Sequence, residues 1–181
     1  MLETSPHGVV AWAPSREGGI GLFIYKHGAG WQDLEPKGKL FRPYCDSDGM
    51  CYDSKRDRML IGWGGGTIRS FDFKTRRIAV HKPANIEIGK IKNTREIVYV
   101  EHADLVLFGS VPVERGKKAY TLAYDCAADK YLLLDAGNPI YGHGAAWQYD
   151  AKRDLVLVTD HQGHACVLKL DRATAGLVEA P

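Results

Sequence analysis

Two histidines near the end of the sequence lie close enough together to be considered as metal ligands. His161 and His164 flank the pair Gln162-Gly163, and Asp160 stands directly before them. A zinc site needs three or four ligands, together with further side chains that orient them. We therefore expect an ordinary polar turn at this position, and we predict no metal ion or other cofactor for the protein.

A second set of chemically capable side chains stands shortly before predicted strands. It comprises Asp46, Asp48, Arg95 and His143. A histidine in such a place can act as a general base or bind a metal, although it is more often a hydrogen-bonded loop residue. No Gly-x-Ser-x-Gly nucleophile elbow is present, and Gly64-Gly65-Gly66 joins two predicted strands instead of opening a phosphate-binding helix. The sequence therefore carries no recognisable catalytic motif.

The elements that position these side chains follow a pattern that returns three times. Tyr52, Tyr99 and Tyr149 each open a segment in which an aspartate follows five residues later and an apolar run comes next. These tyrosines are 47 and then 50 residues apart, and the aspartates keep the same spacing. A period of this length, built from short strand-like pieces, is typical of the blades of a β-propeller.

Short runs rich in apolar, β-branched and aromatic residues, bounded by turn residues, predict strands along the whole chain. The predicted strands are Gly8–Ala13, Ile20–Lys26, Trp31–Leu34, Gly49–Asp53, Arg58–Trp63, Thr67–Asp72, Arg77–His81, Glu96–Val100, Leu105–Gly109, Ala119–Asp125, Lys130–Leu134, Ala145–Asp150, Leu155–Thr159, His164–Asp171 and Gly176–Glu179. Helical periodicity is weak, so we expect an all-β fold of four-stranded antiparallel meanders with almost no helix. The blades fall at about 8–40, 45–82, 95–135 and 144–180 within one domain of residues 1–181, and the first blade lacks its first strand.

The order of features within each repeat is informative about the family. A Tyr-Asp pair, a charged turn ending in aspartate, an apolar strand and a glycine turn lead to a second pair, which is Phe71-Asp72, Tyr124-Asp125 or Leu170-Asp171. This order resembles kelch-type β-propeller repeats over nearly the whole chain. Two features of that family are clear at one place only, namely the paired glycines at Gly64-Gly65-Gly66 and the fourth-strand tryptophan at Trp31. The resemblance implies a β-propeller, and the count of predicted strands gives about four blades, as a partial or self-associating ring.

The number of blades leaves three arrangements open. Propellers usually close with about four to eight blades, and kelch propellers resemble rings of six or seven. An open arc exposes an unpaired strand edge and apolar sheet faces, and both favour association. The chain is therefore a fragment of a longer propeller, half of a ring of about eight blades completed by a second copy, or a ring that closes alone on four.

Loop length distinguishes the two rims of such a ring. The turns after first and third strands are short, and we expect their aspartates to cap backbone N–H groups. The other rim carries the segments 35–48, 82–95, 110–118 and 135–144. Because functional residues concentrate on long loops held by a rigid scaffold, we place ligand binding on this second rim. The candidate ligand-binding residues are Asp46, Asp48, Trp63, Arg95, Arg115, Tyr141, His143 and His161.

Composition and charge narrow the class of partner. A net charge of +2 and a pI near 8.3 argue against generic nucleic-acid binding, which needs a clustered basic face. No apolar run reaches the roughly 18–20 residues that cross a bilayer, and the first residues lack the features of a signal peptide, so we expect a soluble protein that does not bind membranes. The mixed aromatic and basic rim favours a non-enzymatic recognition scaffold that binds a protein, peptide or glycan. The alternative is part of a propeller enzyme that acts on carbohydrate or another small polar substrate at the channel mouth.

Overall fold

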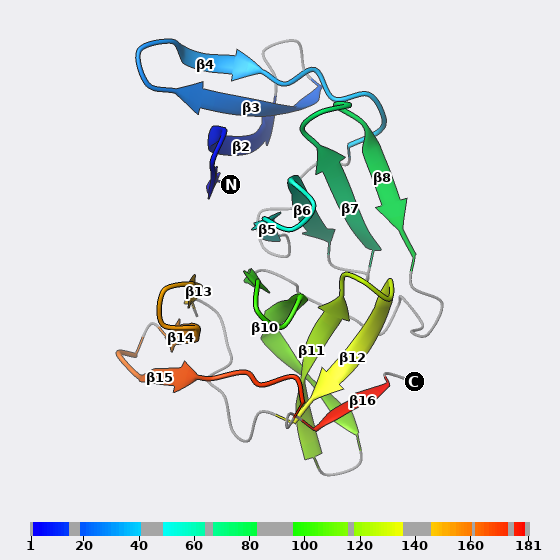
Figure 1. The fold of residues 1–181 in the computed structure, drawn as a ribbon, viewed down its shortest axis with the longest axis vertical. Helices are drawn as coiled ribbons and strands as arrows, with labels where there is room; N and C mark the ends of the chain where they lie inside the picture. Colours follow the sequence, from blue (N-terminus) through cyan, green and yellow to red (C-terminus); the bar gives the residue numbers. More distant parts are fainter. Residues whose placement is uncertain are drawn as a thin grey trace.

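Antiparallel strands are the regular elements of the computed structural model of the chain, shown in Figure 1. The structure describes residues 2–14, 19–40, 49–63, 67–82, 96–115, 118–135, 146–160, 162–173 and 176–179. Within these ranges every named element is a strand, which confirms the predicted all-β fold. The same ranges contain no helix that is long and apolar enough to cross a membrane.

The first sheet has four strands in the order β1-β2-β3-β4. They are β1 (Leu2–Ser5), β2 (Gly8–Pro14), β3 (Ile20–Lys26) and β4 (Gly30–Asp33). The expectation that this blade lacks its first strand is wrong, because Leu2 to Ser5 pair antiparallel with Ala11 to Gly8. The segment Leu-Glu-Thr-Ser contains no apolar run, so its sequence gave no strand signal. In the structure its residues are alternately exposed and partly buried. The hairpin closes where the His7 backbone N–H donates to Ser5 Oγ at 3.2 Å.

The second sheet has the order β5-β6-β7-β8 and follows the predicted bounds to within one residue. Its strands are β5 (Gly49–Asp53), β6 (Arg58–Trp63), β7 (Thr67–Asp72) and β8 (Ile78–His81). Each of these strands is short, and β5, β6 and β7 bury apolar side chains on both faces. That pattern is expected of a blade which packs between two neighbours.

The third sheet departs from the prediction in its second hairpin. Its first four strands are β9 (Ile97–Val100), β10 (Leu105–Arg115), β11 (Lys118–Asp125) and β12 (Lys130–Leu134). The segment 110–118 was expected to be a long loop, and instead β10 continues to Arg115, which pairs with Lys118. A shift in register between Phe108 and Val113 separates this extension from the main ladder. The extension alternates apolar and polar residues too briefly to have been distinguished from a loop.

The fourth sheet has three described strands, β13 (Ala146–Asp150), β14 (Leu155–Thr159) and β15 (Ala165–Leu168). The segment predicted as its fourth strand is β16 (Leu177–Glu179), and that assignment is wrong. β16 pairs antiparallel with β12, so that Val178 lies opposite Leu133 and the third sheet has five strands. β15 is therefore the outermost described strand of the fourth sheet.

The five-residue spacing between tyrosine and aspartate has a geometric cause, because each such tyrosine and aspartate enclose a turn, which we call a Tyr-Asp turn. The hydroxyl of Tyr52 donates to Asp57 Oδ1 at 2.8 Å. The same bond joins Tyr99 to Asp104, Tyr124 to Asp129 and Tyr149 to Asp154, at 2.9, 2.6 and 2.7 Å. Asp57 has a left-handed backbone with φ of 48°, and the other three aspartates are also left-handed. Aspartate is among the few residues that tolerate this conformation, so the turn needs its backbone as well as its carboxylate.

A different aspartate caps the backbone of these turns. The N–H groups of Lys152 and Arg153 donate to Asp150 Oδ1 at 3.0 and 3.1 Å. Asp125 accepts in the same way from Ala127 and Ala128, both at 3.0 Å. The predicted capping role thus belongs to the aspartate that ends the preceding strand. The aspartate that ends the turn holds the tyrosine instead.

The four sheets form a ring in the manner of a four-bladed propeller, with the first strand of each sheet innermost (Figure 1). Three clusters of buried side chains join consecutive sheets. The first cluster includes Trp12, Leu22, Met59 and Ile61; the second includes Leu60, Ile68, Phe108 and Tyr124; the third includes Val98, Leu107, Trp147 and Val158. None of the three clusters joins the first sheet to the fourth.

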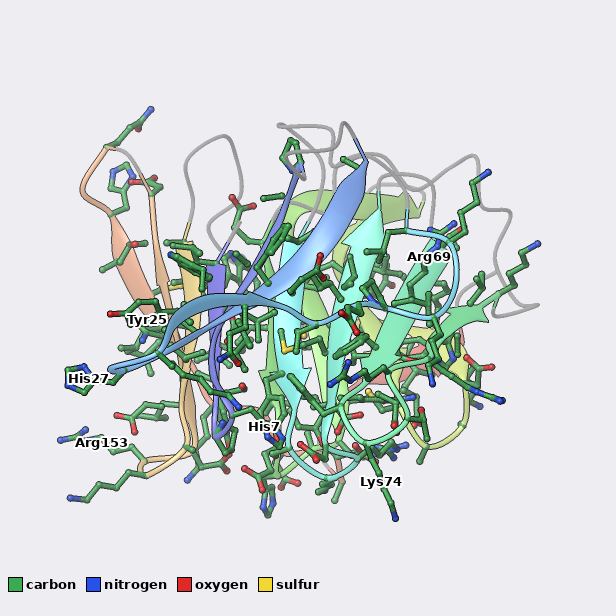
Figure 2. The ribbon with its side chains drawn as sticks, turned by 90° about the horizontal axis from the view of Figure 1, so that it is seen from above. His7, Tyr25, His27, Arg69, Lys74 and Arg153 are labelled. Carbon is green, nitrogen blue, oxygen red and sulfur yellow. The ribbon has the colours of Figure 1, made fainter. Side chains whose placement is uncertain are left out.

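Ion pairs reinforce the same three junctions at the end of the ring where the Tyr-Asp turns lie. Figure 2 shows His7, Lys74 and Arg153, from turns of three different sheets, at this end of the molecule. His7 Nε2 lies 2.6 Å from Asp57 Oδ1 and links the first sheet to the second. Arg56 pairs with Asp104 and links the second sheet to the third. Arg172, in the segment after β15, pairs with Asp125 of the third sheet. Arg56 binds both oxygens of Asp104 at 2.8 Å, which is the bidentate geometry of a strong pair.

Candidate functional site

A cavity of about 760 Å³ lies at the centre of the ring, and every sheet contributes its first strand to the wall. The strand residues that line it are Leu2, Glu3, Thr4, Val9, Cys51, Tyr52, Ile97, Val98, Tyr99, Ala146, Trp147, Gln148 and Tyr149. The cavity reaches the turns after β5, β9 and β13, where Ser54, Glu101 and Ala151 complete the wall. Its volume falls within the range of pockets that hold small ligands.

Glu3 places a carboxyl group in the wall of the cavity. It lies opposite Val10 in the β1–β2 ladder, and its side chain is partly buried. Burial raises the pKa of this carboxyl to about 7, because the charged form loses hydration, and a hydrogen bond from the Thr4 backbone offsets only part of that effect. Near neutral pH the group can therefore donate or accept a proton. Glu3 is absent from the predicted site because no strand was predicted before Gly8.

The tyrosines of the wall are held in their neutral form. Burial and the hydrogen bond to Asp57 raise the pKa of Tyr52 to about 12. Tyr149, which donates to Asp154, has a pKa raised to about 12 for the same two reasons, and the pKa of Tyr99 is raised as well. All three residues line the cavity, although Tyr99 is only 5% exposed because it packs in the second cluster. Their hydroxyl protons are held in hydrogen bonds to aspartates. Proton transfer by tyrosine is disfavoured here at neutral pH.

Cys51 is the thiol of the cavity wall. Burial raises the pKa of Cys51 well above its ordinary value, and the nearby carboxylate of Glu3 raises it further. Since the thiolate is the nucleophilic form, this environment disfavours thiol chemistry. Among the described residues, Cys51, Cys126 and Cys166 are free thiols. In the same part of the chain no group of three or more histidine, cysteine or acidic side chains is placed to hold a metal ion.

Most of the residues predicted as ligand-binding lie outside the described ranges. These are Asp46, Asp48, Arg95, Tyr141, His143 and His161. Trp63 and Arg115 are described through their backbone only, at the end of β6 and at the end of β10. His164, the described histidine of the C-terminal turn, places Nδ1 2.8 Å from Asp160 Oδ2. This contact lies within the turn itself.

A second cavity of about 450 Å³ lies between the first and second sheets, at the end of the Tyr-Asp turns. His7 lies in its wall, stacks on Phe73 with ring centroids 4.2 Å apart and pairs with Asp57. Arg76, also in this wall, binds Glu35 Oε2 at 2.9 Å. Because these charged groups are already engaged within the protein, the second cavity is less suited to a ligand. The central cavity is the better candidate.

No model of a known protein family matches the chain, and no curated protein matches it either. The choice among functions therefore rests on the chemistry of the cavity wall and of the sheet faces.

Proposed function

We propose that the protein is a recognition scaffold that binds a glycan, a peptide or a protein segment at the mouth of its central cavity. The observation that carries the proposal is the wall of that cavity, in which the partly exposed Tyr52 and Tyr149 lie among polar residues contributed by all four sheets. Sugars and extended peptides both combine apolar surface with many hydrogen-bonding groups, and aromatic side chains with polar neighbours suit them. The raised pKa values of these tyrosines and of Cys51 favour binding over nucleophilic catalysis.

The long-loop rim is the second part of the proposed surface. β5 begins directly after Asp48, and β9 and β13 begin two and three residues after Arg95 and His143. All three strands line the cavity. The chain therefore leads from these residues into the cavity wall, which supports a rim that contacts the same ligand. Trp63 and Arg115, at the ends of second strands, belong to this proposed rim as well.

A steric variant tests the proposal. Ala151 is an exposed residue that lines the cavity from the turn after β13, and Ala79 is an exposed strand residue outside the cavity. The wild-type protein is first applied to a printed glycan array and to an immobilised peptide library, and calorimetry then gives the affinity for the strongest hit. We expect Ala151→Trp to weaken that affinity at least tenfold, while Ala79→Trp leaves it within a factor of two. Equal affinities for both variants, or no hit on either array, would contradict the proposal.

A second candidate function is favoured by one observation, the pKa of about 7 for Glu3 inside the cavity. A carboxyl group tuned to neutral pH is the usual general acid or base of enzymes that act on carbohydrate. In this alternative the chain is part of a propeller enzyme, and Glu3 exchanges a proton with a small polar substrate. Glu101 is a second carboxylate in the cavity wall, and it lies in the turn after β9.

The two functions are separated by turnover of 4-nitrophenyl glycosides over a range of pH. The enzyme alternative predicts hydrolysis with an inflection near pH 7, which disappears in Glu3→Gln. Glu101→Gln serves as the matched variant, since it removes a carboxylate from the same wall and should leave the inflection near pH 7 in place. Absence of hydrolysis by the wild type, or an unchanged profile in Glu3→Gln, would remove Glu3 from consideration as a catalytic residue.

We propose as well that the repeats are of the kelch type. The support is the order of the Tyr-Asp pair, the charged turn and the apolar strand, together with a ring of sheets like that of the family it resembles. The five-residue hydrogen bond from tyrosine to aspartate gives this order a physical reason, because both residues are needed to close the turn.

A further inference from the structure

One face of the first sheet and one face of the fourth sheet lie outside the three buried clusters. The register places Leu2, Val9, Phe23, Tyr25 and Trp31 on one face of the first sheet, which we call the leading face. It places Ala146, Gln148, Leu157 and Val167 on one face of the fourth sheet, which we call the trailing face. The opposite faces of the same two sheets pack in the first and third clusters.

These two faces hold most of the exposed apolar bulk of the described chain. Six large hydrophobic side chains are exposed among the described residues, and Val80 is the one that lies elsewhere. The other five are Leu2, Tyr25, Trp31, Leu157 and Val167, with exposed fractions of 64%, 39%, 53%, 41% and 59%. Tyr25 and Trp31 lie against each other, with ring centroids 5.4 Å apart. Exposed apolar side chains gathered on a face mark an interaction surface.

The repeat indicates what should cover the trailing face. Leu60, Leu107 and Leu157 each stand eight residues after the first tyrosine of their repeat, so they occupy equivalent positions. Leu60 packs in the junction between the second and third sheets, and Leu107 packs in the junction between the third and fourth. Both are fully buried, whereas Leu157 is 41% exposed. The position is therefore suited to burial against the next blade, and at the third repeat no described blade covers it.

The leading face is the complementary half of the same kind of junction. Every described junction joins the trailing side of one sheet to the leading side of the next, and the first sheet has the leading side that remains uncovered. Figure 1 shows the first and fourth sheets spread apart on one side of the ring, opposite the closely packed second and third sheets. A sheet that could cover the trailing face of one copy is thus present in another copy.

We propose that two copies of the chain bind head to tail, with the leading face of each packed on the trailing face of the other. Such a contact continues the junction that the chain already makes three times. Each copy contributes both its leading face and its trailing face. Two copies that make both contacts leave neither face uncovered, so the assembly stops at two. Because Leu2, Val9, Ala146 and Gln148 also line the central cavity, the contact borders that cavity in each copy.

The assembly is tested by the molar mass in solution, measured by light scattering after size exclusion over a range of concentrations. The chain has a mass of 20.0 kDa, and we expect a particle of twice that mass, 40.0 kDa, at every concentration above the dissociation constant of the pair. A mass of one chain at all concentrations would overturn the proposal in favour of a ring closed by a single copy. A mass that grows steadily with concentration would also overturn it, because the contacts would then not close.

Charged variants test the two faces separately. Tyr25→Lys alters the leading face and Val167→Glu alters the trailing face; both residues lie on third strands and are exposed, so neither change should affect folding. We expect each variant to have the mass of one chain, with the circular dichroism spectrum of the wild type. Val80→Glu is the matched control, since it alters an exposed valine away from both faces, and it should keep the doubled mass.

Mixing the two charged variants distinguishes head-to-tail binding from the binding of like faces. A mixed pair has one unaltered junction and one junction in which the two introduced side chains, of opposite charge, face each other, so the doubled mass should return. If both variants are single chains and their mixture remains so, the head-to-tail contact is wrong. If either variant alone keeps the doubled mass, the altered face is not part of the contact.

Discussion

The packed junctions and the two open faces are built from the same strands, which makes them a direct comparison. On β14, Val156 and Val158 are almost fully buried against the third sheet, whereas Leu157 between them is 41% exposed. Strand alternation alone sets this difference, because successive side chains point to opposite faces. A blade is thus apolar on both sides whether or not both sides have a neighbour. The difference indicates that the interfaces between blades contribute much of the folding stability, as in other repeat proteins.

The largest expected effect comes from equivalent leucines on the two kinds of face. Leu107→Ala empties a site that is fully buried between the third and fourth sheets, and we expect the free energy of unfolding to fall by about 3 kcal/mol. Leu157→Ala removes the same atoms from the trailing face and should cost less than about 1 kcal/mol when both leucine variants are compared in the single-chain Val167→Glu background, where no second copy covers that face. Urea unfolding followed by tryptophan fluorescence measures both. Equal losses would break the comparison, because they would mean that the trailing face is as well packed as the junction.

A smaller effect is expected from two equivalent glycines. A Cβ atom at Gly109 would overlap the indole ring of Trp147, whereas a Cβ atom at Gly62 would meet Ile97 and Phe108 at an ordinary 3.5 Å. We expect Gly109→Ala to destabilise the fold by about 2 kcal/mol, since the tryptophan ring must move within a packed junction. Gly62→Ala should change stability by less than about 0.5 kcal/mol. Melting temperatures that fall equally for both variants would show that Trp147 does not limit the third junction.

The smallest effect concerns the ion pairs. Arg56 binds Asp104 across the second junction, while Arg153 binds Asp150 within a single exposed turn. We expect Arg56→Gln to lower the free energy of unfolding by about 1 kcal/mol, because the partly buried carboxylate of Asp104 loses its arginine partner. Arg153→Gln should have almost no effect, as is usual for exposed pairs. Denaturation at low and high salt measures both, and a larger loss for Arg153→Gln would contradict the assignment of Arg56 to the junction.

The sequence predicted the strands well because each strand carries its own local signal. Apolar runs between turn residues placed β5, β6 and β7 at their observed bounds, and the Tyr-Asp period placed the blades. The errors fall where pairing is decided by distant parts of the chain. β1 has no apolar pattern of its own, and β16 pairs with β12 in a different sheet from the preceding strand. A single sequence contains no local signal for such partners.

The candidate site was harder to predict for a related reason. Loop length directed attention to the long-loop rim, whereas the described cavity is lined by the first strands, whose residues have the same pattern as any other blade strand. The pKa of Glu3 is raised by burial in the folded chain. A carboxyl group acquires this property from burial, and burial is a property of the assembled ring.

The place of β16 has a consequence for the order in which the protein is made. The other strands of the third sheet lie within residues 97–134, while β16 comes from residues 177–179. During synthesis from the N-terminus, the outer edge of β12 therefore stays unpaired until the whole fourth blade has emerged from the ribosome. At about 5–20 residues per second this interval lasts on the order of seconds. For that time the nascent chain presents an unpaired strand to chaperones and to neighbouring nascent chains.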